Sequence, residues 1–366
     1  MAFVQTFPWS TPASGIARPT IDSCSMRVVA CRSGHRHDAI PVCHNETNSA
    51  AIRDGITMTY TRLQAGEVRL LDGATGTELE KRGVPMSTNA WSGSASLDHL
   101  DTLERIHRDY IDAGADIITA NTYATSRALL ELDGLVDQFE AINRAAVRAA
   151  RQARDRSGRP EVLIAGSLSH RGPIATGSAR PDSGAIGLDT MAEALREQAQ
   201  LLRDEGCDLL LLEMMYDPAR MPLVFEAAAR TGLPVWAGFS ARRGEDGSLL
   251  GFGPGDDIPF AQLVSILHDW DVDAAGIMHT PANLVSEALD SLRATFDGPL
   301  MAYPDSGYFK SPHWQFEDVI APRELRRYAE GWIEQGAQVL GGCCGLSPEH
   351  IAALSPLKRD RRSGTS

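Results

Sequence analysis

Hydrophobic positions in this chain follow two alternating patterns from about residue 67 onward. One pattern is a short, nearly continuous apolar run, and the other is a longer stretch in which apolar residues recur at helical spacing. The apolar runs are EVRLLD (67–72), DIITANT (116–122), VLIAGS (162–167), LLLLE (209–213), VWAGFS (235–240), AAGIMH (274–279), PLMAYP (299–304) and QVLGG (338–342). Helical periodicity covers residues 100–115, 138–154, 191–206, 218–232 and 322–337.

This alternation predicts the fold class. Nearly continuous apolar strands that alternate with helices are typical of a parallel sheet covered by helices. Eight such strands favour a closed (β/α)8 barrel of the TIM type over an open sheet. No GxGxxG motif follows the first run, which argues against a dinucleotide-binding open sheet. We therefore predict one α/β domain, a TIM barrel over residues 58–356.

The two ends of the chain lack this pattern. Residues 1–57 show neither the helical nor the strand period, and we expect a disordered extension, with Met58 as an alternative start. Its cysteines and histidines lack the closely spaced pair of a zinc module, so we expect no metal there. Residues 357–366 read as a polar, basic, solvated tail.

Composition narrows the possible partners. The net charge of −13 argues against a nucleic-acid surface and against a basic membrane-binding stripe. No apolar run approaches the roughly 20 residues of a membrane span. Six cysteines in 366 residues do not make a disulfide scaffold, which favours a reducing, cytoplasmic setting. Small molecules remain as the expected partners, and a homo-oligomer is left open.

Residues able to do chemistry gather where the predicted strands end. Active sites of (β/α)8 barrels lie at the carboxyl ends of the strands. The residues found there are Asp72, Asn121, Thr122, Tyr123, Glu213, His279, Tyr303, Asp305, Cys343 and Cys344. Cys207 precedes the fourth strand, so we expect an inert packing thiol at the opposite end. Asp72 has a second interpretation as the N-cap of a helix that begins near Thr75, and the two roles are compatible.

The motif GGCCG (341–345) points to a metal. Adjacent cysteines are poorly placed to bridge one another. In a closed barrel the sixth and eighth strands are separated by one strand, so His279 can converge with Cys343 and Cys344. One imidazole and two thiolates are ligands that zinc prefers, and three protein ligands leave a coordination position open for a thiol substrate.

The chain from about residue 67 to 352 resembles the homocysteine S-methyltransferases. The matching stretches are LLDGATGTELEKRG, GADIITANTYATS, AGSLSHRGP, LLLLEMM, YPDSG and GGCCG. The resemblance implies that Cys343 and Cys344 bind zinc. It also implies that Asp72, the backbone around Gly73, and Glu213 hold the amino-acid part of homocysteine. Thr122, Tyr123 and Ser167 lie where walls of the pocket are expected.

Two residues depart from the family pattern. The family usually has Asn-Cys at the end of the sixth strand, where this chain has Met278 and His279, and its usual Asn in the seventh-strand motif is Asp305 here. Histidine is a competent zinc ligand, so a His-Cys-Cys site is chemically reasonable. We hypothesise that Asp305 orients the imidazole of His279.

The resulting prediction is a zinc-dependent methyltransferase. It would move a methyl group from a small onium donor, such as S-methylmethionine, S-adenosylmethionine or betaine, to the thiol of homocysteine and give methionine. No cobalamin or folate module follows the barrel in this sequence, which disfavours a methionine synthase role. The alternatives are methyl transfer to another thiol, metal-assisted hydrolysis, and a barrel that has lost its metal and serves only to bind.

Overall fold

The fold is built around a parallel barrel. The computed structural model describes residues 63–178, 182, 184–253 and 257–359. The barrel strands are β1 (Arg69–Leu70), β2 (Ile117–Ala120), β3 (Leu163–Leu168), β4 (Leu209–Met215), β5 (Val235–Phe239), β8 (Ala274–Pro281), β9 (Leu300–Asp305) and β12 (Ala337–Leu340). They are hydrogen-bonded in the order β1-β12-β9-β8-β5-β4-β3-β2, and all pairs are parallel. A parallel bridge between Leu71 and Ile117 joins the two ends of this sheet. The predicted (β/α)8 barrel is confirmed.

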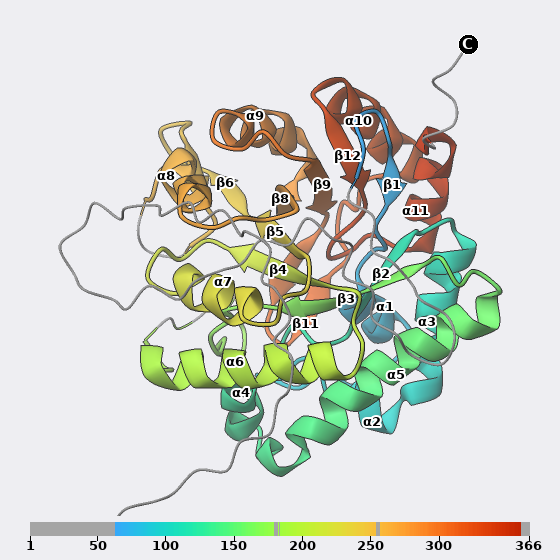
Figure 1. Cartoon of the computed structure of the whole chain (residues 1–366), viewed down its shortest axis with the longest axis vertical. Coiled ribbons are helices and arrows are strands. Elements are labelled where there is room, and N and C mark those ends of the chain that lie inside the picture. Colours follow the sequence, from blue (N-terminus) through green and yellow to red (C-terminus); the bar gives the residue numbers. More distant parts are fainter. Residues whose placement is uncertain (1–62, 179–181, 183, 254–256, 360–366) are drawn as a thin grey trace, which may run out of the picture. The chain divides into compact units, whose positions relative to one another are not determined.

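Helices cover the outside of the barrel, as Figure 1 shows. Those that connect strands are α3 (Leu100–Asp112), α5 (Phe139–Ser157), α6 (Leu188–Asp204), α7 (Met221–Ala229), α8 (Phe260–Val264), α9 (Ala282–Arg293) and α10 (Pro322–Glu334). Shorter helices are α1 (Thr75–Lys81), α2 (Ala95–Asp98), α4 (Arg127–Leu132) and α11 (Pro348–Leu354), with 3-10 turns at Val136–Gln138, Ser265–His268 and Ser355–Leu357. Every residue of β3 and β5 is buried, because helices lie outside these strands and side chains fill the barrel inside.

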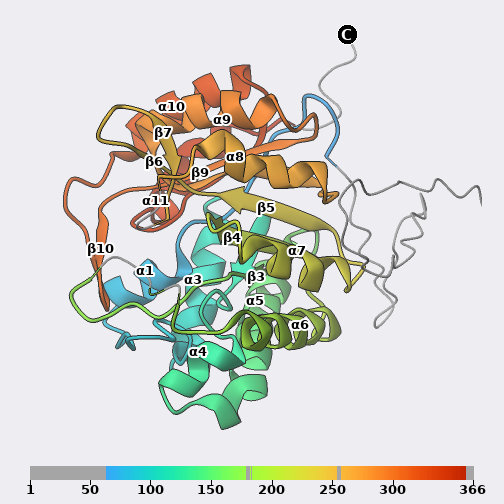
Figure 2. The same ribbon diagram turned by 90° about the vertical axis from the view of Figure 1, so that its left-hand side faces the viewer.

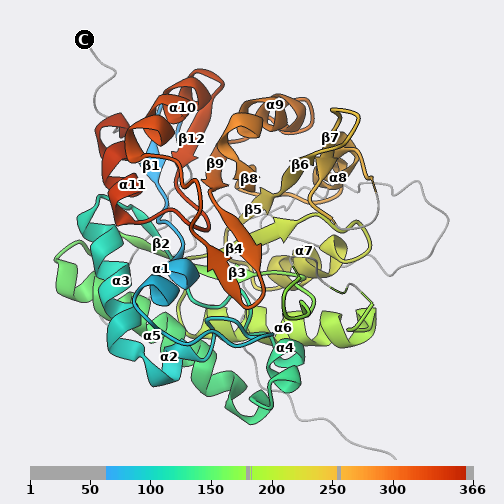
Figure 3. The ribbon, with the colours of Figure 1, turned by 180° about the vertical axis from the view of Figure 1, so that it is seen from behind.

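The strand order places the ends of β8 and β12 close together. β9 lies between them and pairs with both. Figure 3 shows β1, β12, β9 and β8 as neighbours. Residues that follow β8 and β12 therefore reach the same region, as the sequence predicted for His279, Cys343 and Cys344.

Two barrel strands change register where they enter the site. In β4 the register with β5 shifts between Leu212 and Met215, and Met214 has a φ of 59°. In β8 the register with β9 shifts between Met278 and Pro281, and His279 has a φ of 41°. Such irregularities redirect side chains at barrel rims, and positive φ is uncommon for residues other than glycine. The bends thus aim Glu213 and His279 into the barrel mouth.

Two small hairpins extend beyond the barrel and were not predicted. They are β6 (Ala241–Arg243) with β7 (Leu249–Gly251), and β10 (Tyr308–Lys310) with β11 (His313–Gln315). Figure 2 shows β10 beside α1, the first helix after β1. Glu80 of α1 fixes this hairpin, since its carboxylate lies 2.8 Å from His313 Nδ1 and accepts a hydrogen bond of 3.0 Å from the backbone N–H of Trp314.

The predicted boundaries need one correction. Residues 357–359 belong to the barrel and not to a solvated tail. Arg359 pairs with Val68 in an antiparallel bridge, and Lys358 Nζ forms an ion pair with Asp116. The predicted disordered extension at residues 1–57 and the end of the tail lie outside the described residues. In the described part of the chain, no helix combines the length and apolarity needed to cross a membrane.

Candidate functional site

A cavity of about 340 Å³ opens at the carboxyl ends of the barrel strands. Its wall includes most of the residues that the sequence singled out: Asp72, Gly73, Tyr123, Glu213, His279, Asp305, Cys343 and Cys344. The cavity therefore brings together residues at the carboxyl ends of six different strands, β1, β2, β4, β8, β9 and β12. This is the position of active sites in (β/α)8 barrels.

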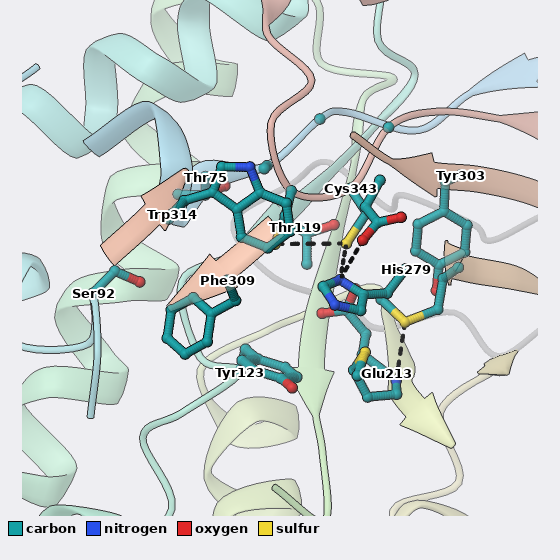
Figure 4. Close-up of a pocket in the computed structure, with 18 of the residues that line it drawn as sticks. Thr75, Ser92, Thr119, Tyr123, Glu213, His279, Tyr303, Phe309, Trp314 and Cys343 are labelled. Carbon is teal, nitrogen blue, oxygen red and sulfur yellow. Dashed lines mark hydrogen bonds and ion pairs between the residues drawn. The ribbon is translucent and has the colours of Figure 1, made fainter. Parts of the chain in front are cut away.

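Three of these residues form a group able to hold a metal ion. His279, Cys343 and Cys344 offer ligand atoms that all lie within 4.8 Å of one another. Cys343 Sγ lies 3.6 Å from His279 Nδ1 and 3.9 Å from Cys344 Sγ. Figure 4 shows the Cys343 thiol and the His279 imidazole facing each other. The convergence predicted from the strand order is found.

The backbone around the two cysteines is tightly constrained. Cys343 donates its N–H to Pro304 O at 2.7 Å, which ties the loop after β12 to the end of β9. Gly345 has a φ of +82°, and a Cβ at this position would lie 1.9 Å from the carbonyl oxygen of Ser306. Only glycine fits such an approach in a left-handed conformation. The second half of the GGCCG motif is thus explained by the turn that presents the thiols.

Asp305 adds a carboxylate beside this group. Its Oδ2 lies 3.6 Å from His279 Nδ1, the same nitrogen that faces Cys343. Burial lowers the pKa of His279, but the charge of Asp305 and the contact with Cys343 outweigh it and raise this pKa to about 9. Asp305 is therefore an electrostatic neighbour of the imidazole. The hypothesis that it orients His279 through a hydrogen bond stays a prediction, because 3.6 Å is longer than such a bond.

Two further carboxyl groups line the cavity, the buried Asp72 and the half-buried Glu213. Asp72 accepts hydrogen bonds from the backbone N–H of Thr119 at 2.7 Å and from its hydroxyl at 2.9 Å. Glu213 accepts a hydrogen bond from the Ser167 hydroxyl. Burial raises the pKa of each carboxyl group to about 7. A cation beside them would lower both pKa values and keep both groups ionised at neutral pH, so this part of the cavity suits an ammonium group.

The N-cap interpretation of Asp72 is not supported. Helix α1 begins at Thr75, its N-cap residue is Ala74, and no side chain caps it through a hydrogen bond. The carboxylate of Asp72 is directed to Thr119 of β2 instead.

Thr122 lies behind the cavity wall instead of in it. It is fully buried, and its hydroxyl donates to Ser167 O at 2.9 Å and accepts from Ser167 N at 3.0 Å. Thr122 thereby joins the ends of β2 and β3. Ser167 is also fully buried and reaches the site only through Glu213. Cys207 is a buried free thiol at the start of β4, as predicted.

The sequence reasoning missed the aromatic part of the wall. Trp91, Phe252, Phe309 and Trp314 line the cavity, and the last two come from the β10–β11 hairpin. The His279 ring lies 5.1 Å from the Phe252 ring and 5.7 Å from the Trp314 ring. These four residues could have been found from their positions, because they lie outside the predicted strands and helices. Loops seldom need large apolar side chains, so an aromatic residue in a loop indicates a possible binding surface.

Arg171, which also lines the cavity, was missed as well. It follows β3, and its guanidinium carbon lies 5.7 Å from the centre of the Tyr123 ring. It lies within the stretch AGSLSHRGP that matches the family, but an arginine there carries no signal of its own that distinguishes it from a surface arginine.

Comparisons with known proteins find a matching family model and curated relatives. The family model described as homocysteine S-methyltransferase matches residues 69–357. The homocysteine S-methyltransferase YbgG of Bacillus subtilis is 28% identical over 80% of this chain and 95% of its own length. A selenocysteine methyltransferase of Astragalus bisulcatus is 28% identical over 82% of this chain and 96% of its own.

A solved structure extends the likeness to three dimensions. The metallated form of the homocysteine methyltransferase MmuM from Escherichia coli superposes with a TM-score of 0.65, with 28% sequence identity over 80% of this chain and 96% of that one. The family model spans the whole barrel, from β1 to the last turn after α11. The chain therefore belongs to the homocysteine S-methyltransferase family and is a methyltransferase.

Proposed function

We propose that this protein transfers a methyl group from a small onium donor to the thiol of homocysteine, with zinc held by His279, Cys343 and Cys344. The observation that carries the proposal is a His-Cys-Cys group in the same cavity as the carboxyl groups of Asp72 and Glu213. A thiol amino acid offers a sulfur to the first group and an ammonium to the second. A solved relative is named a metallated homocysteine methyltransferase, which supports a metal in this family.

The donor set fits zinc. Two cysteine sulfurs and one imidazole nitrogen are ligands that zinc prefers, and a three-residue set leaves room for a substrate atom. Zinc bound there would lower the pKa of a thiol that reaches it. The described cysteines are free, in keeping with the reducing cytoplasm that we propose as the compartment.

The carboxyl groups orient the acceptor. An ammonium group between Asp72 and Glu213 would lower the pKa of both and leave them ionised at neutral pH. Thr119 and Ser167 fix the carboxyl groups by hydrogen bonds, so the site is largely preformed. Orientation of the amino-acid part holds the thiol at the His-Cys-Cys group, and this proximity is the main contribution that the protein makes to the rate.

The aromatic wall suits the donor. A sulfonium or quaternary ammonium group is attracted to aromatic faces. Phe252 and Trp314 flank His279, so a methyl group carried by an onium centre there lies next to the acceptor sulfur. The sulfur attacks the methyl carbon as the bond from carbon to the onium centre breaks, and the donor leaves uncharged at that centre. A cavity of about 340 Å³ favours small donors such as S-methylmethionine or betaine over S-adenosylmethionine.

The test measures zinc content and methionine formation on the full chain. We expect about one zinc per chain and methionine from homocysteine with an onium donor, both lost in Cys343→Ala. Cys207→Ala is the matched control, because this thiol lies outside the cavity, and it should retain both. Parallel reactions with selenocysteine test a second acceptor, since one relative is named for that substrate. Zinc-free protein that still forms methionine, or zinc-loaded protein that methylates neither acceptor, would overturn the proposal.

A further inference from the structure

Arg171 carries a buried positive charge that the acceptor site does not use. The residue is 6% exposed and lines the cavity. Its Nε and Nη2 atoms are buried and have no hydrogen-bond partner among the described residues. Nor does any described carboxylate lie within 4.0 Å of its guanidinium. Burial of a charged group without a partner is strongly unfavourable, so a cavity-lining guanidinium of this kind points to an anionic ligand.

The surroundings of Arg171 show which part of the cavity this anion would occupy. Its charge acts on Tyr123 and Tyr216, whose pKa values are raised by burial and lowered in part by the guanidinium. The charge that acts on Glu213 is instead that of His279. Arg171 therefore lies on the side of the cavity formed by Tyr123, whose ring centre is 5.7 Å from its guanidinium carbon.

A row of aromatic rings connects this region with the metal-binding group. The Tyr216 ring lies 5.7 Å from the Phe252 ring, which in turn lies 5.1 Å from the His279 ring. Tyr123, which Arg171 contacts, lines the cavity together with Phe252 and His279, so a ligand there would have its anionic end at Arg171 and its onium end near His279.

We propose that Arg171 binds the carboxylate of the methyl donor, so that the donor is a zwitterion that carries both an onium centre and a carboxylate. This inference rests on the proposed methyl transfer to a thiol. A donor with only a positive charge would enter a cavity that already holds a guanidinium and would be repelled by it. A donor carboxylate cancels this repulsion and satisfies the buried nitrogens, because the guanidinium fork matches a carboxylate with two parallel hydrogen bonds.

The experiment compares Arg171→Gln, Arg171→Lys and the wild type with donors that differ in the carboxylate. S-methylmethionine and betaine carry it, whereas trimethylsulfonium and tetramethylammonium do not. Arg171→Gln should raise KM for a carboxylate donor roughly 10-fold to 100-fold, as expected when charge-assisted hydrogen bonds are lost. KM for homocysteine should change little, and the rate with trimethylsulfonium should stay the same or rise, because the guanidinium that repels this cation is gone. Arg171→Lys should recover part of the loss with a carboxylate donor. Arg242→Gln is the control, since this arginine pairs with Asp257 at the surface and lies outside the cavity.

Two further measurements keep the inference separate from the proposed function. Calorimetric titration with S-methylmethionine measures donor binding without turnover, and weaker binding to Arg171→Gln supports the inference even if no methyl group is transferred. Thermal unfolding without ligand should show Arg171→Gln to be as stable as the wild type or more stable, since the variant removes a buried charge that has no carboxylate partner among the described residues. Equal donor affinity in the variant, an increase in KM for homocysteine instead, or a less stable variant would each overturn the assignment.

Discussion

Replacement of Glu213 by Gln tests the carboxyl half of the site through stability. The pKa of Glu213 rises from an ordinary value of 4.5 to about 7, mainly because the side chain is buried. Each tenfold change in a protonation equilibrium corresponds to about 1.4 kcal/mol. The ionised carboxylate therefore destabilises the ligand-free protein by up to about 3 kcal/mol at pH 8. Glutamine keeps the shape and a hydrogen-bonding group for Ser167 but carries no charge.

The sign of the pH dependence follows from proton binding. Between pH 4.5 and about 7 the native state holds a proton that the unfolded state has released. The contribution of Glu213 to stability is thus fully present below pH 4.5 and is lost as the pH rises through about 7. Glu213→Gln should raise the free energy of unfolding by about 2 to 3 kcal/mol more at pH 8 than at pH 5.

Urea denaturation of the ligand-free protein at pH 5 and pH 8 measures this difference. Glu334→Gln, at the exposed end of α10, is the matched control and should show no such dependence on pH. The same Glu213→Gln variant should lower kcat/KM for homocysteine by about 10-fold to 100-fold, because a charge-assisted hydrogen bond to the ammonium is lost. A variant that is equally stable at both pH values, or that uses homocysteine as well as the wild type, would refute the reasoning.

Three other variants test the remaining parts of the site. Trp314→Ala should raise KM for the onium donor by about 5-fold or more and change KM for homocysteine little. A partly desolvated cation–π contact contributes about 1 to 2 kcal/mol. Steady-state kinetics with each substrate varied separately measure both KM values. Gly345→Ala should unfold at a lower temperature and bind less zinc, because a Cβ there would lie 1.9 Å from Ser306 O; thermal unfolding and metal analysis are the measurements, and an unchanged zinc content would contradict the role of the turn. Asp305→Asn should weaken zinc retention against a competing chelator, because the imidazole loses the carboxylate 3.6 Å from its Nδ1; retention equal to that of the wild type would show that Asp305 does not act on the metal group.

The barrel was predictable because its strands are buried on both faces. LLLLE and VWAGFS read as continuous apolar runs, and β4 and β5 occupy those segments. Once eight such runs are placed in a closed parallel barrel, the ends of the sixth and eighth strands must lie near each other. The group of His279, Cys343 and Cys344 follows from that topology with no knowledge of side-chain positions.

Side-chain direction was the first feature that the sequence did not determine. Asn121, Thr122 and Tyr123 follow the same strand, but Tyr123 lines the cavity while Thr122 turns toward β3. Directions after a strand depend on the local turn and not on the two-residue period of the strand itself. The positive φ values of Met214 and His279 could not be predicted either, because neither residue type by itself indicates a left-handed backbone conformation.

The walls supplied by loops were the second such feature. The hairpin that contributes Phe309 and Trp314 is held by Glu80, which is more than 200 residues away in the sequence. Three-residue strands with such distant anchors leave no periodic pattern in the sequence. Arg171 lies in an irregular segment after β3, and its burial depends on neighbours from several loops.

The charges of the cavity account for the way in which two substrates could share it. Asp72 and Glu213 resist ionisation while no cation is beside them, and Arg171 has no anionic partner among the described residues. Both the carboxyl groups and the guanidinium therefore destabilise the ligand-free protein. An ammonium group would stabilise the ionised carboxyl groups, and a carboxylate would stabilise the guanidinium. If the acceptor and the donor relieve separate ends, their stabilising effects on thermal unfolding should be independent and add. If both compounds instead compete for one end, saturation with homocysteine would remove the stabilisation by the donor, and the division of the cavity into an acceptor side and a donor side would be wrong.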